Sequence, residues 1–483
     1  MPDKYALTRG IARIGGRIVG GFVVLAVAAG VVTAAIALPW PTLQAPPASA
    51  VVAPVPSEQQ RVCPGPVLAL AEDSSQAGAA TSVGRADSTF EAWSEASGSV
   101  GVTRSDIDAV DNLGTDTTAA PEELTVPAPA GETAAPLVAG SQSQGLATDS
   151  LTGLAVAACG EAASDVWLVG GSTDVGRTTL VLLSNPTAVI ATVSLTVYGE
   201  TGVVDAPGAS GILVQPGEQR IVALAGLAPN LISPIVNVQS AGGQVVATLQ
   251  QSSIRGIEPG GIDLIGGAAV PALEQTIAGL DVTIEPAAEQ SADPDALPSV
   301  RLMTVGDAPA TVQIGVTSAT GTAAGSSTQV EIEPGIATQV PFPDLAVGSY
   351  SVQITSDQPV VAAARTSTVG TVGRDFAWYP SSGELDGDFL VSVAAGPSPT
   401  LHLVNTATTD ADIVATPTAG EPVRVSVAAG ARADLPLDES VSYVVSGGET
   451  TVASVGYVGD GQLASFALNP AGPLAEAIRV YLH

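Results

Sequence analysis

The segment Thr179–Gly199 reads TLVLLSNPTAVIATVSLTVYG and decides the fold class. Apolar and polar residues alternate on both sides of a turn at Asn185, a pattern typical of two antiparallel strands with one buried and one wet face. The pattern returns at Ser299–Ser318 (SVRLMTVGDAPATVQIGVTS) and at Thr400–Gly420 (TLHLVNTATTDADIVATPTAG). Three copies indicate an all-β chain built from internal repeats.

Further landmarks accompany each copy in the same order. A strand introduces it, and a glycine turn and a valine-alanine strand follow it. The introducing strands are Asp165–Gly171, Asp281–Pro286 and Asp388–Gly396; the turns are Pro216-Gly217, Pro334-Gly335 and Ala429-Gly430; the later strands are Gln244–Leu249, Pro359–Ala364 and Thr451–Gly456. About seven short strands in roughly 75–100 residues are typical of a β-sandwich, and we expect tandem modules of immunoglobulin-like topology. The missing Cys…Trp…Cys signature argues against a true antibody-type domain.

The landmarks set the predicted domain boundaries. Residues 161–270 form module 1, residues 271–380 a linker and module 2, and residues 381–483 module 3. Helix signals are scarce, and the best candidate is Pro271–Gly279. Because aromatic residues are only 4% of the chain, the cores must be aliphatic. We expect these residues inside: Leu182, Val193, Val312, Ile354, Leu403 and Val425.

The amino-terminal segment predicts a membrane anchor. Residues 1–17 form a basic tail with Lys4, Arg9, Arg13 and Arg17 against the single acid Asp3. Residues 18–38 carry no charge, and as a helix they would span about 30 Å, the thickness of a bilayer core. The basic flank favours a cytoplasmic amino terminus, with the bulk of the chain outside a cell membrane that it crosses once.

A cleaved signal peptide is the alternative interpretation. Ala48-Ser49-Ala50 has the small-x-small form that a signal peptidase accepts, but it lies 12 residues beyond the apolar run. Between them begins a linker at residues 39–60, whose richness in proline and alanine is typical of a semi-extended spacer.

The only two cysteines, Cys63 and Cys159, lie on the predicted exterior, where an even count favours a disulfide. Two buried free thiols are the alternative. The bond would close the region 61–160, which is partly of low complexity, and the sequence leaves open whether residues 74–150 are ordered.

Charge and composition exclude several function classes. The chain has 16 basic and 47 acidic residues, a net charge of −31 that repels nucleic acid. Two cysteines exclude a four-cysteine zinc site, two histidines leave little room for a histidine-rich one, and we predict no metal and no cofactor.

Few residues are candidates for chemistry. His402 alternates with Leu401 and Leu403, which predicts a solvent-facing side chain. Two acidic clusters, Asp106, Asp108, Asp111 and Glu384, Asp386, Asp388, could supply paired carboxylates or bind calcium, but neither fits the spaced calcium loop and solvated loops are the favoured explanation. The aromatic cluster Phe376, Trp378 and Tyr379 is a candidate contact for carbohydrate or a partner protein, with packing between modules as the alternative.

The segment CGEAASDVWLVGG at Cys159–Gly171, continuing into the SNPTA turn and the TVYG strand, resembles an actinobacterial family of membrane-anchored extracytoplasmic proteins of unknown function. Cys63 before Pro64 belongs to the same pattern, and the likeness covers most of the chain after Arg61. The resemblance implies an exported, β-rich envelope protein, and it supplies no catalytic residues.

These observations lead to one expectation and two alternatives. We expect a non-enzymatic cell-envelope scaffold that contacts a wall polysaccharide or another envelope protein. The alternatives are a carbohydrate-binding accessory of cell-wall or glycosyltransferase machinery, with Trp378 and Tyr379 on the sugar, and a carboxylate-dependent hydrolase.

Overall fold

The computed structural model describes residues 21, 23–30, 33, 49–52, 58–70, 80–113, 120–128, 135–285, 296–318, 326–470 and 478–481. The chain divides into two compact units. One contains Met1–Ala53 with Ala477–His483, and the other is Pro54–Glu476.

The first unit contains a short antiparallel ribbon. Strand β1 (Ser49–Val52) pairs with β36 (Ile478–Tyr481), with Ser49 opposite Tyr481. Residues 23–30 are helical. Among the described residues, no helix has the length and hydrophobicity needed to cross a membrane. The predicted tail 1–17 lies outside the described residues, as do parts of the predicted membrane segment 18–38 and of the linker 39–60.

Module 1 shows the plan on which the second unit is built. One sheet has the order β12-β18-β14, with β15 and β16 both paired to β14, and the other has the order β20-β19-β13-β17. The strands are β12 Asp165–Val169, β13 Arg177–Asn185, β14 Ala191–Gly199, β15 Gly202–Val203, β16 Ser210–Val214, β17 Glu218–Ala223, β18 Ile235–Gly242, β19 Val246–Arg255 and β20 Glu258–Ile265. A single-turn helix, α2 (Leu224–Leu227), follows β17.

Module 2 follows the same plan with one long shared strand. Its strands are β21 Ala272–Val282, β22 Ser299–Thr304, β23 Ala310–Ser318, β24 Ser326–Ile332, β25 Thr338–Pro341, β26 Gly348–Gly370 and β27 Gly373–Pro380. The first half of β26 pairs with β21 and β23, and its second half pairs with β22 and β27. One strand of 23 residues therefore joins both sets of strands into a single seven-stranded sheet.

Module 3 repeats the plan with eight separate strands. They are β28 Phe389–Ser392, β29 Thr400–Asn405, β30 Ala411–Pro417, β31 Val423–Val427, β32 Arg432–Pro436, β33 Ser442–Ser446, β34 Thr451–Gly459 and β35 Gln462–Leu468. The sheet orders are β28-β33-β30-β31 and β32-β29-β34-β35. The first strand thus pairs with the sixth in modules 2 and 3 and, because of the extra short strand β15, with the seventh in module 1, whereas an immunoglobulin domain pairs its first strand with its second. The all-β architecture and its repeat are present, and the strand order differs from the immunoglobulin order that we expected.

The region before module 1 is a fourth copy of the plan, which the sequence analysis did not recognise. Its strands are β2 Gln59–Cys63, β3 Leu68–Leu70, β4 Ala80–Ser82, β5 Asp87–Ser94, β6 Gly98–Ser99, β7 Thr103–Asp106, β8 Asp108–Ala109, β9 Glu122–Val126, β10 Leu137–Ala147 and β11 Thr152–Ala158. The sheets β2-β9-β7 and β11-β10-β5 reproduce the pairing of the other modules, whereas β6 and the separate β3-β4 pair depart from it. The predicted disulfide is confirmed: Cys63 at the end of β2 is bonded to Cys159 just after β11, which closes this N-terminal module.

Burial explains why the strands form where they do. In β23 buried and more exposed positions alternate along ATVQIGVTS, as expected for a sheet with one face in a core. In β13 nearly every position is buried, because Leu180 and Leu182 pack against the N-terminal module while Val181 and Leu183 enter the core of module 1. Of the predicted core residues, Leu182, Val193, Val312, Ile354 and Leu403 are buried and Val425 is partly buried.

The predicted helix Pro271–Gly279 is wrong. Ala272–Val282 forms β21, which pairs along its length with β26. The alanine, leucine, glutamate and glutamine in this segment favour a helix locally, but a free sheet edge beside them outweighs that weak preference.

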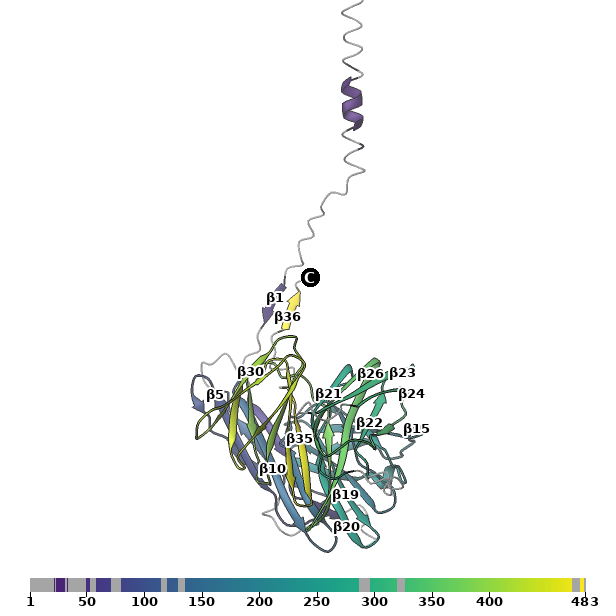
Figure 1. Cartoon of the computed structure of the whole chain (residues 1–483), viewed down its shortest axis with the longest axis vertical. Coiled ribbons are helices and arrows are strands. Elements are labelled where there is room, and N and C mark those ends of the chain that lie inside the picture. Colours follow the sequence, from purple (N-terminus) through teal and green to yellow (C-terminus); the bar gives the residue numbers. More distant parts are fainter. Residues whose placement is uncertain are drawn as a thin grey trace, which may run out of the picture. The chain divides into compact units, whose positions relative to one another are not determined.

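Contacts between the four modules close into a cycle. β8 pairs with β17, β20 packs on β27, β21 packs on β34, and β28 packs on β10. Figure 1 accordingly shows β5 and β10, from early in the chain, beside β30 and β35, from its end. Buried polar groups seal the junctions: the Gln250 amide donates to Leu68 O (2.6 Å), and Ser141 Oγ donates to Ser392 O (2.7 Å).

Candidate functional site

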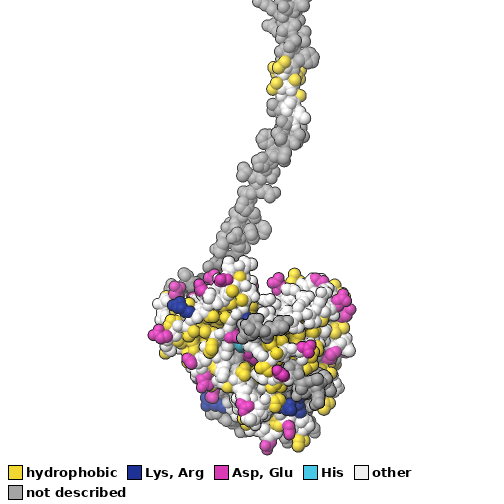
Figure 2. Space-filling model, in the orientation of Figure 1, with side chains coloured by type: hydrophobic (Ala, Val, Ile, Leu, Met, Phe, Trp, Pro, Cys, Tyr) yellow, Lys and Arg dark blue, Asp and Glu magenta, His cyan; other side chains and the backbone are white. Residues whose placement is uncertain are grey.

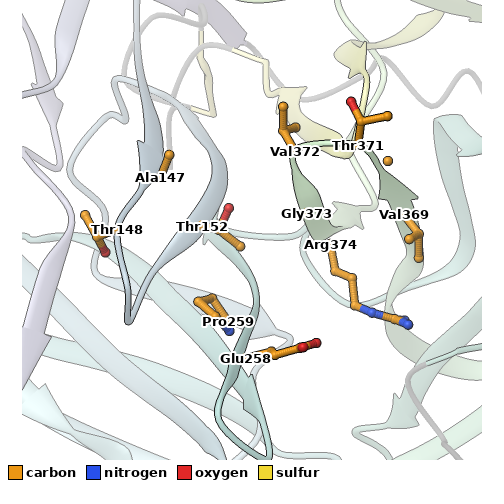
Figure 3. Close-up of a pocket in the computed structure, with 11 residues that line it drawn as sticks. Ala147, Thr148, Thr152, Glu258, Pro259, Val369, Thr371, Val372, Gly373 and Arg374 are labelled. Carbon is orange, nitrogen blue, oxygen red and sulfur yellow. The ribbon is translucent and has the colours of Figure 1, made fainter.

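The last two strands of each module form a hairpin, which we call its closing hairpin: β10–β11, β19–β20, β26–β27 and β34–β35. The final strands pack together, with β11 on β20, β20 on β27, β27 on β35 and β35 on β11. Turns of three closing hairpins line a depression of about 510 Å³ (Figure 3), which we call the hairpin depression. Its lining residues are Ala147, Thr148, Thr152, Glu258, Pro259 and 369–374. Because ligand sites form preferentially where domains meet, this is the candidate binding surface.

The walls of the hairpin depression combine hydroxyl, charged and aliphatic groups. Figure 3 shows Thr148 on one side and Thr371 on the other. Glu258 and Arg374 provide one negative and one positive group, and neither forms an ion pair with another described residue. The fourth hairpin joins through Asp460, whose carboxylate accepts the Thr371 N–H (2.8 Å) and hydroxyl. All four modules therefore meet at this surface.

One buried carboxylate holds the final strands together next to the depression. Asp375 in β27 follows the lining residue Arg374 and is 1% exposed. Its Oδ2 accepts the N–H groups of Leu154 in β11 (2.8 Å) and Leu463 in β35 (3.1 Å), and its Oδ1 accepts that of Ile262 in β20 (3.1 Å). A single side chain thus satisfies one backbone donor from each of the other three modules.

Two glycines give this carboxylate its space. A Cβ atom on Gly153 would lie 2.3 Å from Asp375 Oδ1, and one on Gly261 would lie 2.8 Å from the same oxygen. Their φ angles of +121° and +118° also fall in the region that glycine favours. The close approach of β11 and β20 to Asp375 therefore requires glycine at both positions.

A second buried acid lies in the same cluster. Asp263 in β20 accepts the Trp378 N–H (2.7 Å). Burial raises the pKa of both Asp263 and Asp375 well above the usual range, against the lowering effect of their backbone hydrogen bonds. Since both carboxyls are sealed from solvent, they stabilise the junction of the modules and offer no acid or base to a substrate.

The aromatic cluster packs between modules. Phe376, Trp378 and Tyr379 are 0%, 1% and 1% exposed, so none presents a ring face to a sugar or a partner. The Trp378 indole N–H donates to Gln251 in module 1 (2.7 Å), and the Arg301 guanidinium lies 4.4 Å above the indole ring. Burial thus contradicts the surface-contact interpretation and agrees with the packing alternative.

His402 is also buried, which corrects its predicted exposure. It is 2% exposed, with Nδ1 2.7 Å from Asp434 Oδ1 and Nε2 3.5 Å from Asp281 Oδ2. Although burial lowers its pKa, the hydrogen bonds and charges of the two aspartates raise the pKa of His402 to about 9. The imidazolium therefore joins β29 and β32 of module 3 to β21 of module 2. A histidine protonated at neutral pH is not a general base.

The acidic clusters form no metal-binding arrangement. Asp111 is engaged with Arg220 (Nε to Oδ2, 2.7 Å) and accepts the Ile221 N–H (2.9 Å). Glu384 accepts the Thr406 hydroxyl (2.6 Å). Within the described ranges, no group of three or more His, Cys, Asp or Glu side chains could hold a metal ion.

Sequence reasoning missed Asp263 and Asp375, although both carry a signal. Each aspartate interrupts an apolar strand shortly after glycine, in GGIDLIGG and in VGRDFAWYP. An acid inside such a run is either an error of strand assignment or a buried, hydrogen-bonded carboxyl. The depression itself has no local signature, because its walls come from turns of separate modules.

Comparisons with known proteins give a family and no activity. A family model described as "Family of unknown function (DUF5719)" matches residues 113–456, which include strands of all four modules. No curated protein matches the chain. One solved structure that matches is "Crystal Structure of Thermotoga maritima 1070", with 18% identity, 24% of this chain and 96% of that chain covered, and a TM-score of 0.20. That likeness is too distant to support an argument.

Proposed function

The chain belongs to the family of unknown function DUF5719, and because that family supplies no activity, we propose a function from the geometry. We propose a non-enzymatic, membrane-anchored scaffold outside the cytoplasm that presents the hairpin depression to another protein of the cell envelope. The resemblance noted in the sequence favours an envelope of the actinobacterial type.

The burial of the chemically competent groups carries this proposal. Asp263 and Asp375 are buried and hydrogen-bonded to other modules, and the buried His402 ring lies 3.5 Å from Asp281 of module 2. Groups used in this way hold four sandwiches as one body, whereas general acids and bases must reach a substrate. The accessible part of the junction is the hairpin depression, where backbone turns and short side chains form a surface suited to binding.

Three features support the location. The Cys63–Cys159 bond suits an oxidising compartment. The basic tail and the uncharged residues 18–38 suit a single-pass anchor. Cleavage after Ala50 would leave only Val51 and Val52 of β1 in the ribbon with β36, which favours retention of the segment that precedes it. In the view of Figure 2, acidic side chains are scattered over the second unit and basic ones are few, which suits colloidal solubility.

A protein partner is favoured over a carbohydrate. The hydroxyls of Thr148, Thr152 and Thr371 could bind a sugar, but no aromatic ring is among the residues that line the depression. Sugar sites commonly use such a ring as a stacking face, and the only aromatic cluster of module 2 is buried. The accessory role in wall-polysaccharide assembly is therefore the second candidate.

Photocrosslinking in intact cells tests the scaffold role. A photoreactive amino acid at Thr148 should give a discrete adduct with an envelope protein, and one at Glu421, an exposed residue outside the depression, should not. Equal adducts at both positions would contradict the proposed surface. Hydrolysis of purified wall polymer by the full-length protein would contradict the non-enzymatic assignment, and resistance of residues 54–476 to protease added to intact cells would contradict the location.

A further inference from the structure

Exposed aliphatic side chains gather on the turns beside the hairpin depression. Ile257 is 93% exposed, Val175 82% and Val372 60%. The Ile254 N–H donates to Gly176 O (2.7 Å), which places the Val175 turn against the hairpin that carries Ile257. Turn positions usually hold polar residues, so aliphatic side chains here indicate a surface that is covered by something else. We call the turns 174–177, 255–258 and 370–373, with the depression, the hairpin-tip face.

The same face is close to electrically neutral. The charged residues on these turns and on the other two closing-hairpin turns are Asp149, Asp174, Arg177, Arg255, Glu258, Arg374 and Asp460. They comprise three arginines and four acids, while the whole chain carries −31. Two copies of so acidic a protein repel each other over most of their surfaces, and this end is where the repulsion is small.

The opposite charges of Glu258 and Arg374 make the hairpin-tip face electrostatically complementary to the same face of a second copy. They carry opposite charges, line the same depression, and form no ion pair with another described residue. In a twofold interface, the contact of one residue with another occurs twice, once in each direction. Two such faces brought together could therefore form two equivalent ion pairs from a single pair of residues.

We propose that the hairpin-tip face is a twofold interface between two copies of this chain, in which Glu258 of each copy pairs with Arg374 of the partner subunit. Apolar side chains of the other copy would pack against the aliphatic wall formed by Pro259, Val369 and Val372. Among the apolar side chains of the hairpin-tip face, that of Ile257 is the most exposed. This inference goes beyond the scaffold role and gives the hairpin depression a different occupant, so a Thr148 photoadduct with a second copy of this chain would favour it over an envelope partner.

Charge reversal in the full-length protein tests the proposal. Sedimentation equilibrium in excess detergent would compare the wild type with Glu258→Arg, Arg374→Glu and the double variant. Each single change places like charges opposite each other at two symmetric positions, so the dissociation constant should rise at least about tenfold. The double variant restores opposite charges and should return to within about threefold of the wild type. Glu421→Arg and Arg424→Glu, on exposed residues of module 3, are the matched controls and should behave as the wild type.

A wild type that stays monomeric up to about 100 μM would overturn the proposal. So would single variants that dimerise as the wild type does, or single variants that dissociate without rescue in the double variant. Unchanged thermal unfolding of all the variants would show that the changes act on association and not on folding. Because this readout is oligomeric state, its failure leaves the photocrosslinking test of the scaffold role unaffected.

Discussion

Removal of the Asp375 carboxylate should destabilise the junction of the four modules. In the native protein this group accepts the N–H groups of Leu154, Ile262 and Leu463, one from each neighbouring final strand. Asp375→Ala leaves these three buried donors without an acceptor. Asp375→Asn keeps one side-chain oxygen, which can accept the two N–H groups, of Leu154 and Leu463, that share Oδ2 in the wild type. Its amide NH₂ then faces the N–H of Ile262, which is left without an acceptor.

The structure sets the size of the effect. An unsatisfied buried backbone donor costs about 1–3 kcal/mol, so the alanine variant loses about 3–9 kcal/mol. The loss is partly offset because the variant no longer buries a carboxyl. We expect a fall in the free energy of unfolding of at least about 3 kcal/mol for alanine and about 1–3 kcal/mol for asparagine. Typical total stabilities are about 5–15 kcal/mol, so the alanine variant should be visibly compromised.

Two measurements check this prediction. Guanidinium unfolding followed by tryptophan fluorescence gives the global change, and Trp378 in the same strand as Asp375 makes the signal sensitive to the junction. Hydrogen exchange of the Leu154, Ile262 and Leu463 amides gives the local change. The exposed acid Asp388, changed to alanine, is the control. An alanine variant within about 0.5 kcal/mol of the wild type, with those three amides still protected, would refute the reasoning.

Three further predictions concern other parts of the second unit. The pKa of His402 is about 9 in the folded protein against an ordinary 6.5, so the stability that its charge provides is complete below pH 6.5 and is lost as pH rises through 9. His402→Gln should therefore flatten the decline in melting temperature between these pH values. An unchanged decline would contradict the charged state of His402. Reduction of the Cys63–Cys159 bond, whose cysteines are separated by 96 residues, should lower the free energy of unfolding by about 4–5 kcal/mol in the chain-entropy model. Urea unfolding with and without reductant measures this change, and equal midpoints would show that the bond is not stabilising. Gly153→Ala should destabilise more than Gly202→Ala, because both have φ above +110° but only the first would place a Cβ against a carboxylate; equal melting temperatures would contradict this.

Local patterning predicted the strands well where apolar and polar residues alternate cleanly. The segment Ala310–Ser318 is an example, and its burial pattern follows the sequence residue by residue. The N-terminal module escaped recognition because several of its strands are short and polar. Thr103–Asp106, for instance, is exposed at all four positions and pairs with β9 through backbone hydrogen bonds and the Arg104–Glu122 ion pair. Pairing between backbones leaves no hydrophobic pattern for sequence reasoning to find.

The errors at the candidate site have a different cause. Alternation correctly placed His402 on the opposite face of its strand from Leu401 and Leu403, but it does not reveal what covers that face. Module 2 covers it, and the covering residue Asp281 lies 121 positions earlier in the chain. The same holds for Asp375, whose three partners come from three other modules. Junctions between repeats are determined by how whole modules pack, so single-strand patterns cannot predict them.

The cyclic contact order has a consequence for biosynthesis. Ser141 and Ser392, which join the N-terminal module to module 3, are separated by 251 residues. The earliest part of the chain to be made therefore keeps an uncovered flank until almost the last part arrives. A nascent chain with such a flank is open to wrong associations, and contacts this distant in sequence slow the search for the native arrangement. Ribosome-stalled or truncated products that lack module 3 should consequently aggregate or be degraded. Cells that make this protein would benefit from a holdase chaperone that binds its N-terminal module until module 3 is made.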